Sequence, residues 1–265
     1  MHIKPKKRLG QNFLFDKNIQ RKIISACELK PSDSVLEIGS GRGELTKLIA
    51  QHVSEVYAIE IDSYLYEILK DNLKRYTNVK IINQDLLELD FKRYFGKLKN
   101  KIKIVGNIPY YITTPIIEYL LKYRNKIEAI FITVQKEFAQ RITAKPGSKD
   151  YGSFSCFVQY YTKAQRLFFI KKTSFFPMPK VDSALLRLET KEKAVSGIKA
   201  KNERLLFKII RAAFNKRRKT LKNSLAGLIP LQKLEQFFEK YNINSNIRPE
   251  ELSLEDFVNL ANSAL

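Results

Sequence analysis

Short apolar runs alternate with longer helical patterns through the first half of the chain. The apolar runs span residues 34–38, 55–60, 79–83, 103–107 and 128–134. Between the first three runs, apolar side chains recur at the three- and four-residue spacing of an amphipathic helix. Parallel strands need crossover connections and are buried on both faces. The alternation therefore predicts an α/β fold with a mainly parallel sheet between layers of helices.

The pattern changes in the second half of the chain. Two further β-like runs, 157–162 and 183–189, flank a proline-containing loop, and no long helical pattern lies between them. We therefore expect these two runs to pair as antiparallel strands at an edge of the sheet.

A polar segment from 191 to 200 separates this region from one that is helical throughout. Amphipathic stretches follow the segment, the last of them around Phe257. We expect two domains: a sheet-containing domain over residues 1–190 and a small all-helical domain over residues 191–265.

The composition adds a strong charge imbalance to this picture. The 265 residues include 48 Lys and Arg against 27 Asp and Glu, a formal net charge of +21. Self-repulsion of this size is unfavourable unless a polyanion offsets it, and neutralising phosphates releases counterions. The charge therefore favours a nucleic-acid partner. A lysine-rich composition typical of an AT-rich genome is the alternative interpretation.

Cysteine and histidine are scarce. Cys27 and Cys156 lie far apart in the sequence, which predicts neither a disulfide framework nor a zinc site. His2 and His52 are too few for a histidine metal site or a Ser-His-Asp triad. The first ten residues lack the apolar stretch of a signal peptide, and no apolar run reaches membrane-spanning length. We expect a cytoplasmic protein with no metal and no membrane partner.

The turn after the first expected strand is rich in glycine. Gly39, Gly41 and Gly43 let the backbone approach a ligand closely, next to the free amides of a helix start. The dinucleotide fingerprint places its third glycine one residue later, where this chain has Glu44, so the spacing argues against a nicotinamide cofactor. It matches the acidic-x-Gly-x-Gly-x-Gly pattern of S-adenosylmethionine methyltransferases. A tight turn that binds nothing is the alternative.

The next two strand ends carry carboxylates. Glu60 ends the second run and can accept hydrogen bonds from ribose hydroxyls, and Asp85 follows the third and can accept from an adenine amine. Each carboxylate could simply be solvated. Together with the glycine turn, however, they belong to consecutive strand ends, which meet at one crevice in such sheets.

The fourth run ends in Asn107, Ile108, Pro109 and Tyr110. Proline removes a backbone donor, so the Ile108 carbonyl can face inward as an acceptor, and the Asn107 side-chain oxygen is a second acceptor. Two acceptors can hold both protons of an exocyclic amine and turn its lone pair towards a methyl donor. The Tyr110 ring can stack on an extruded base. A proline-containing turn without chemical function is the alternative.

With these motifs the chain resembles the ribosomal RNA adenine N6,N6-dimethyltransferase family of KsgA-type (RsmA) enzymes, to which the Erm methyltransferases are related. Further segments that resemble the family's motifs are residues 7–14, 146–152 and 175–183. The resemblance covers nearly the whole chain. It implies a Rossmann-like class I S-adenosylmethionine methyltransferase sheet, parallel with an antiparallel edge strand, and a helical C-terminal domain.

The resemblance also implies roles for individual residues. Residues 1–30 are expected to form a basic segment that folds over the cofactor, with contacts from Asn12 and Leu14. Phe175 is expected to line the target-base pocket opposite Tyr110. The residues at matching cofactor positions are Gly39, Gly41, Glu60, Asp85 and Asn107.

Basic side chains gather in the helical tail around Phe214. They are Arg211, Lys216, Arg217, Arg218, Lys219 and Lys222. The run 215–219 cannot lie on one helix face, so we expect it to straddle a helix start and contact phosphates. A solvated basic face is the alternative. A second basic patch, beside the expected cofactor lid, consists of Lys4, Lys6, Lys7 and Arg8.

The resemblance implies methyl transfer from S-adenosylmethionine, which becomes S-adenosylhomocysteine. The expected target is the N6 amine of two adjacent adenosines near the 3′ end of small-subunit rRNA in an assembling subunit. We expect the enzyme to be a monomer. The alternatives are an Erm-type enzyme acting on large-subunit rRNA, a DNA adenine methyltransferase, and a non-catalytic ribosome assembly factor. DNA enzymes typically have a second proline in the Asn107–Tyr110 motif, and the intact motifs argue against loss of activity.

Overall fold

The computed structural model describes residues 5–6, 9–191, 199–216 and 219–265. The described residues form two compact units. The first comprises residues up to 139 together with 165–190, and the second comprises 140–164 together with residues from 191 onward.

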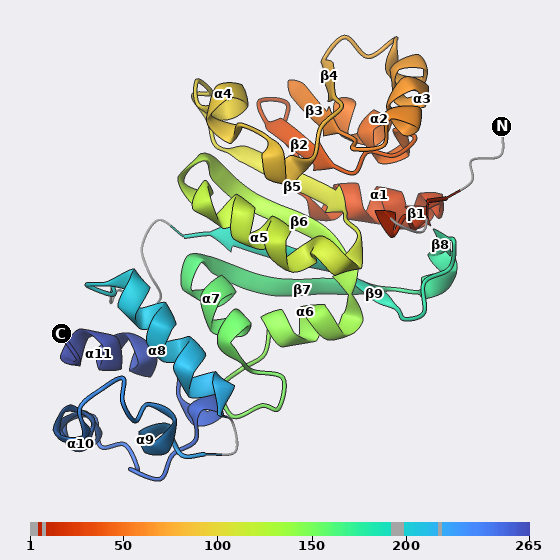
Figure 1. The fold of residues 1–265 in the computed structure, drawn as a ribbon. Helices are drawn as coiled ribbons and strands as arrows, with labels where there is room; N and C mark the ends of the chain where they lie inside the picture. Colours follow the sequence, from red (N-terminus) through yellow and green to blue (C-terminus); the bar gives the residue numbers. More distant parts are fainter. Residues whose placement is uncertain (1–4, 7–8, 192–198, 217–218) are drawn as a thin grey trace. The chain divides into compact units, whose positions relative to one another are not determined.

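The first unit contains a seven-stranded sheet with the strand order β4-β3-β2-β5-β6-β9-β7 (Figure 1). In chain order the strands are β2 (Ser34–Ile38), β3 (Glu55–Ile59), β4 (Val79–Ile82), β5 (Ile102–Asn107), β6 (Ile127–Gln135), β7 (Thr162–Ile170) and β9 (Ser183–Thr190). Strands β2 to β6 pair in parallel, and β9 pairs antiparallel with β6. The expected α/β class with a mainly parallel sheet is confirmed. The antiparallel strand, however, lies one position inside the edge, because β7 occupies the edge.

The helices that connect the parallel strands are α2 (Glu44–Ala50), α3 (Ser63–Leu73), α4 (Phe91–Phe95) and α5 (Thr113–Lys122). Helix α1 (Lys17–Ala26) precedes β2, and α6 (Lys136–Ile142) follows β6. Ile23 of α1 and Ile49 of α2 pack with Val35 and Val105 in one apolar core, while Leu69 of α3 packs against Ala58. The strands are buried along most of their length, because helices cover the sheet.

A second, two-stranded sheet joins distant parts of the chain (Figure 1). Strand β1 (Phe13–Leu14) pairs antiparallel with β8 (Phe175–Phe176), so that Phe13 lies opposite Phe176 and Leu14 opposite Phe175. This pairing ties the N-terminal segment to the proline-rich motif that precedes β9.

The expected strand over residues 157–162 is wrong. Residues Ser153–Tyr161 form helix α7, and strand β7 begins at Thr162. Six of the eight residues in 154–161 are apolar or aromatic, and so few polar positions do not distinguish a helical period from a strand period. The expected strand over 183–189 is confirmed as β9.

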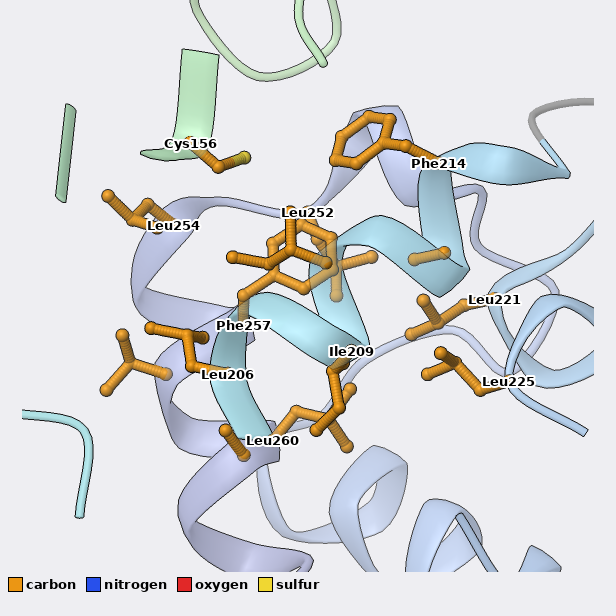
Figure 2. Packing of buried hydrophobic residues seen from close by; sticks show 14 of the residues in the cluster. Cys156, Leu206, Ile209, Phe214, Leu221, Leu225, Leu252, Leu254, Phe257 and Leu260 are labelled. Atoms are coloured by element: carbon orange, nitrogen blue, oxygen red, sulfur yellow. The ribbon is translucent and has the colours of Figure 1, made fainter. Parts of the chain in front are cut away.

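The second unit is built around α7, α8 (Glu203–Asn215), α9 (Leu221–Ser224), α10 (Leu231–Lys240) and α11 (Leu254–Ser263). Figure 2 shows its apolar core, in which Leu206 and Ile209 of α8 face Phe257 and Leu260 of α11. Cys156 of α7 belongs to the same core.

Segment 140–164 therefore packs with the helical region, although the sequence places it before the expected domain boundary at residue 190. Tyr151 and Cys156 are fully buried in the apolar core of the second unit. Gly147 N donates to Glu250 O at 2.7 Å. The burial of these side chains is a tertiary effect that the order of segments along the chain does not reveal.

Candidate active site

The parallel register aligns the carboxyl ends of four strands. Ile38 of β2 lies opposite both Ile59 of β3 and Gly106 of β5, and Ile59 lies opposite Ile82 of β4. The residues that follow these positions therefore emerge at the same edge of the sheet. A cavity of about 960 Å³, open to solvent, lies at this edge.

The cavity brings together most of the expected cofactor and catalytic residues. Those among its lining residues are Asn12, Gly39, Gly41, Glu60, Asp85, Asn107, Ile108, Pro109 and Tyr110. An adjoining hollow shares Phe13, Gly39, Gly41 and Asn107 with the cavity and adds Leu14.

The glycine turn is left-handed at its key positions. Gly39 has φ 71° and Gly41 has φ 57°, values that side chains disfavour. A Cβ atom at Gly39 would lie at an ordinary contact distance, 3.5 Å, from the Asn107 carbonyl oxygen, so the positive φ rather than crowding favours glycine here. The turn thus leaves backbone rather than side chain beside the cavity.

Glu60 is held by backbone amides. Gly41 N donates to its Oε2 at 2.8 Å and Asp62 N donates to its Oε1 at 2.9 Å. Only 4% of the residue is exposed. Burial raises the pKa of Glu60, although the two backbone hydrogen bonds oppose the shift. Each oxygen keeps a second lone pair with which the carboxylate could accept from a ligand hydroxyl.

Asp85 caps the short 3-10 helix η2 (Leu86–Glu88). Its Oδ1 accepts from Leu87 N at 2.9 Å. One carboxylate oxygen thus fixes the side chain at the rim of the cavity, and Oδ2 is the further acceptor of this group.

Asn107 is oriented by the N-terminal segment. Its Nδ2 donates to Asn12 O at 2.8 Å, so the Oδ1 of the amide is left as an acceptor. Pro109, with φ −59° and ψ 135°, turns the chain from β5 into the 3-10 helix η3 (Tyr110–Ile112). Ile108 is buried and lines the cavity. The expected turn with two acceptors therefore lies next to the glycine turn.

Tyr110 is anchored by a residue that the sequence analysis did not single out. The Tyr110 hydroxyl and Ser183 Oγ are 2.6 Å apart and share a hydrogen bond. Burial raises the pKa of Tyr110, and the bond to Ser183 opposes the shift. Ser183 is the last residue of the motif 175–183, so the sequence did contain a pattern that includes this serine. The pattern itself could not reveal that its serine meets the tyrosine of another motif.

Glu37 is a second residue that was missed. Thr46 Oγ1 donates to its Oε2, and only 2% of the residue is exposed. Burial raises the pKa of Glu37 to about 7, with hydrogen bonding to Thr46 opposing the shift. Glu37 lines the adjoining hollow together with Gln20. The sequence pattern that could have identified Glu37 is the acidic first position of the acidic-x-Gly-x-Gly-x-Gly motif.

Phe175 is not brought into the cavity. It is 2% exposed, pairs with Leu14 across the two-stranded sheet, and packs in the same core as Ile23. Among the described residues it lines neither the cavity nor the adjoining hollow, whereas Tyr110 lines the cavity. Its expected position in the target-base pocket opposite Tyr110 stays a prediction. Strand pairing with β1 buries the Phe175 side chain and leaves Phe176 exposed.

The expected RNA-contact residues are only partly described. Lys7, Arg8, Arg217 and Arg218 lie outside the described residues, as does Lys4. Arg211, Lys216 and Lys219 are exposed, and Lys222 is half-buried.

The described residues of the basic run do not lie at a helix start. Asn215 ends α8, and α9 begins only at Leu221, with Thr220 as its cap. Lys222 Nζ pairs with Glu235 at 3.1 Å, and Lys6 Nζ pairs with Asp62 at 2.7 Å.

Within the described part of the chain, no group of three or more His, Cys, Asp or Glu is placed to hold a metal ion. None of the described helices is both long and apolar enough to cross a membrane.

Comparison with known proteins decides the family. Residues 2–264 match the model of the ribosomal RNA adenine dimethylase family. The chain belongs to this family. The resemblance inferred from the motifs is thus confirmed.

Curated relatives of this family member carry the name ribosomal RNA small subunit methyltransferase A. One from Clostridium botulinum (strain Kyoto / Type A2) is 42% identical over 256 residues, covering 96% of this chain and 92% of the relative. One from Geobacillus sp. (strain WCH70) is 41% identical over 266 residues, covering 97% and 91%.

Solved structures of similar proteins agree. A dimethyladenosine transferase from Plasmodium falciparum superposes with a TM-score of 0.79 at 27% identity, covering 94% of this chain and 95% of that one. The 23S rRNA methyltransferase ErmE superposes with a TM-score of 0.76 at 25% identity, covering 96% and 99%. The Rossmann-like methyltransferase fold expected from the sequence is confirmed.

The pKa of Glu37 predicts a pH-dependent stability. Its folded-state value of about 7 lies above the ordinary 4.5, so the folded state binds the extra proton between these values. The contribution is fully present below pH 4.5 and is lost as the pH rises through 7. Glu37→Gln should remove this loss, worth about 3 kcal/mol between pH 4.5 and 8. Urea unfolding across this pH range measures the free energy of unfolding.

Glu44→Gln, at an exposed position of the same motif, is the control and should retain the wild-type decline in stability. A Glu37→Gln profile parallel to that of wild type would contradict the prediction.

The Tyr110–Ser183 bond predicts a coupled effect on catalysis. Ser183→Ala should lower the rate of adenine methylation about fivefold, because one hydrogen bond that fixes Tyr110 is worth about 1 kcal/mol. Tyr110→Phe removes the same bond from the other side, so the double variant should lose little more than Tyr110→Phe alone. If the losses of the two single variants simply add up in the double variant, the hydrogen bond does not position the Tyr110 ring.

Proposed function

We propose that this chain transfers methyl groups from S-adenosylmethionine to the N6 amines of two adjacent adenosines in a loop near the 3′ end of small-subunit rRNA, during ribosome assembly. The observation that carries the proposal is the single cavity that joins the glycine turn, Glu60 and Asp85 with the Asn107–Tyr110 turn. A cofactor crevice and an amine-binding turn at one sheet edge suit transfer between two bound molecules.

The residues present fit S-adenosylmethionine. The left-handed glycine turn leaves room for close backbone approach, and Glu60 and Asp85 keep acceptor oxygens for ribose hydroxyls and an adenine amine. Ile61 and Leu87 add apolar walls to the same cavity. We assign cofactor contacts to these residues and to Asn12, Leu14, Gly39, Gly41 and Asn107. When bound, the cofactor supplies an electrophilic methyl group on a sulfonium.

The chain's own residues hold the target amine. Asn107 Oδ1 and the Ile108 carbonyl accept one amine proton each, which draws the nitrogen lone pair out of conjugation with the purine ring. Pro109 fixes the turn, and Tyr110, held by Ser183, supplies an aromatic face for the extruded base. Catalysis by these residues is mainly positioning.

We retain Phe175 in the proposal as a residue of the target-base pocket, and its packing also supports the residues around that pocket. Its burial against Leu14 holds β8 on β1, and the next residues lead to Ser183. Through Ser183, the motif reaches the Tyr110 hydroxyl.

Basic side chains of the helical unit are proposed to contact rRNA phosphates. They are Arg211, Lys216, Arg217, Arg218, Lys219 and Lys222, together with Lys7 and Arg8 near the N-terminus. The net charge of +21 supports this assignment, because each neutralised phosphate releases counterions. The RNA contact expected of Lys6 stays a prediction. In the structure, the Lys6 ammonium group pairs with Asp62.

The identity levels favour the small subunit as target. The relatives named for small-subunit methylation are 41% and 42% identical over nearly the whole chain, whereas ErmE, named for 23S rRNA, is 25% identical. We expect a monomer that acts in the cytoplasm on an assembling subunit.

Methyl transfer to immature small subunits tests the function. We expect N6,N6-dimethyladenosine, identified by mass spectrometry of the digested rRNA. Asn107→Ala should lower its formation about a hundredfold or more, because it removes an acceptor aimed at the reacting amine. Product on large-subunit RNA would instead assign an Erm-type activity. Cofactor binding without any transfer by the wild-type protein would assign an assembly factor.

The RNA-contact proposal predicts a change in salt dependence. Arg217→Ala with Arg218→Ala should weaken RNA binding and reduce the slope of log affinity against log salt by about 2, while cofactor affinity stays unchanged. Lys201→Ala with Lys240→Ala removes the same charge at exposed positions outside the basic run and is the matched control. Equal slopes for the two double variants would refute a specific role for the run.

A further inference from the structure

The N-terminal segment forms one wall of the cavity. Lining residues from this segment are Leu9, Gly10, Gln11, Asn12 and Phe13. Gly10 turns the segment with φ 57°, and a Cβ atom there would lie 3.1 Å from the Tyr111 ring. Asn12 O accepts the hydrogen bond from Asn107. We call residues 9–13 the N-terminal wall.

One carboxylate, that of Asp62, binds two side chains of the N-terminal segment. Asp62 Oδ1 accepts from Lys6 Nζ at 2.7 Å, and Asp62 Oδ2 accepts from Gln11 Nε2 at 3.1 Å. Gln11 Oε1 in turn accepts from Lys6 N at 2.8 Å, which closes a ring of three residues. Both Asp62 oxygens are therefore engaged with the N-terminal segment.

Asp62 also touches the carboxylate to which we assign the ribose. Its backbone N donates to Glu60 Oε1 at 2.9 Å. The residue thus lies between the N-terminal wall on one side and Glu60 on the other, and only 4% of it is exposed.

Capping of α3 alone does not account for this residue. Asp62 Oδ1 accepts from Tyr64 N at 3.0 Å and so caps the helix, but serine or asparagine would cap a helix as well. Burying a carboxylate costs free energy, and burial by itself raises the pKa of Asp62. Hydrogen bonds from Lys6 and Gln11 outweigh that effect and hold the pKa below its ordinary value. The N-terminal segment therefore helps to keep Asp62 charged, and the charged Asp62 in turn helps to hold that segment in place.

We propose that Asp62 is a positioning residue that holds the N-terminal wall closed over the bound cofactor, with Lys6 and Gln11 as its partners. The inference rests on the proposed function, because it takes the cavity to be the S-adenosylmethionine site. It assigns Lys6 to cofactor retention rather than to the RNA surface.

Asp62→Ser tests the inference, because serine keeps a helix cap but is too short to hold both partners. We expect the dissociation constant of S-adenosylhomocysteine, measured by calorimetry, to rise about tenfold, mostly through faster dissociation. The KM for S-adenosylmethionine should rise by a similar factor, and kcat should fall by a smaller factor, because the wall also contains Asn12, whose carbonyl orients Asn107. Asp71→Ser, the same substitution at an exposed position of α3, should bind as wild type.

Partner variants keep the test decisive if Asp62→Ser proves unstable. Lys6→Met and Gln11→Ala leave the helix cap intact, and each should weaken S-adenosylhomocysteine binding about threefold. In combination with Asp62→Asn, the loss from Lys6→Met should be smaller than in wild type, since its charge partner is gone.

The outcomes separate this inference from the function on which it rests. A wild-type protein that binds no S-adenosylhomocysteine would overturn the proposed function itself. A wild-type protein that binds it, with unchanged binding in Asp62→Ser or Lys6→Met, would overturn only the role of Asp62. Weaker RNA binding with unchanged cofactor affinity in Lys6→Met would return Lys6 to the RNA surface.

Discussion

Parallel pairing of β2, β3, β4 and β5 in one register is the constraint on which the rest of the structure depends. Because Ile38, Ile59 and Gly106 lie side by side, the residues that follow them emerge at one edge. A crevice at the carboxyl ends of such strands is a general property of open α/β sheets. The glycine turn, Glu60 and the Asn107 turn are each short local features, and the register makes them a single cavity.

The same edge concentrates buried carboxylates, and each is satisfied differently. Glu37 accepts a hydrogen bond from the Thr46 hydroxyl, and Glu60 accepts from two backbone amides. Asp62 accepts from side chains of the N-terminal segment. A buried charge without partners would be costly, so the partners determine which groups stay charged near neutral pH. The partners of Glu60 are backbone amides of the sheet edge itself, whereas the partners of Asp62 are side chains of the N-terminal segment.

Two distant motifs support the Asn107–Tyr110 turn from opposite directions. The N-terminal segment supplies the Asn12 carbonyl to the Asn107 amide, and the motif before β9 supplies the Ser183 hydroxyl to Tyr110. The short sheet of β1 and β8 joins these two supports to each other. Membership of the adenine dimethylase family is consistent with such convergence, because methyl transfer between two bound molecules needs geometry more than acid–base strength.

By itself, the sequence determined the α/β class, the parallel strands, the glycine turn and the Asn107–Tyr110 turn. These features depend on local spacing, on hydrophobic period and on residues with restricted or permissive backbones. Tertiary structure alone decided that residues 153–161 are helical, that Phe175 is buried, and that Ser183 and Asp62 meet their distant partners. The physical reason is that a mostly apolar and aromatic run shows no clear helical or strand period. Likewise, which face of a strand is buried, and which side chain a polar group meets, are determined by packing between segments far apart in the chain.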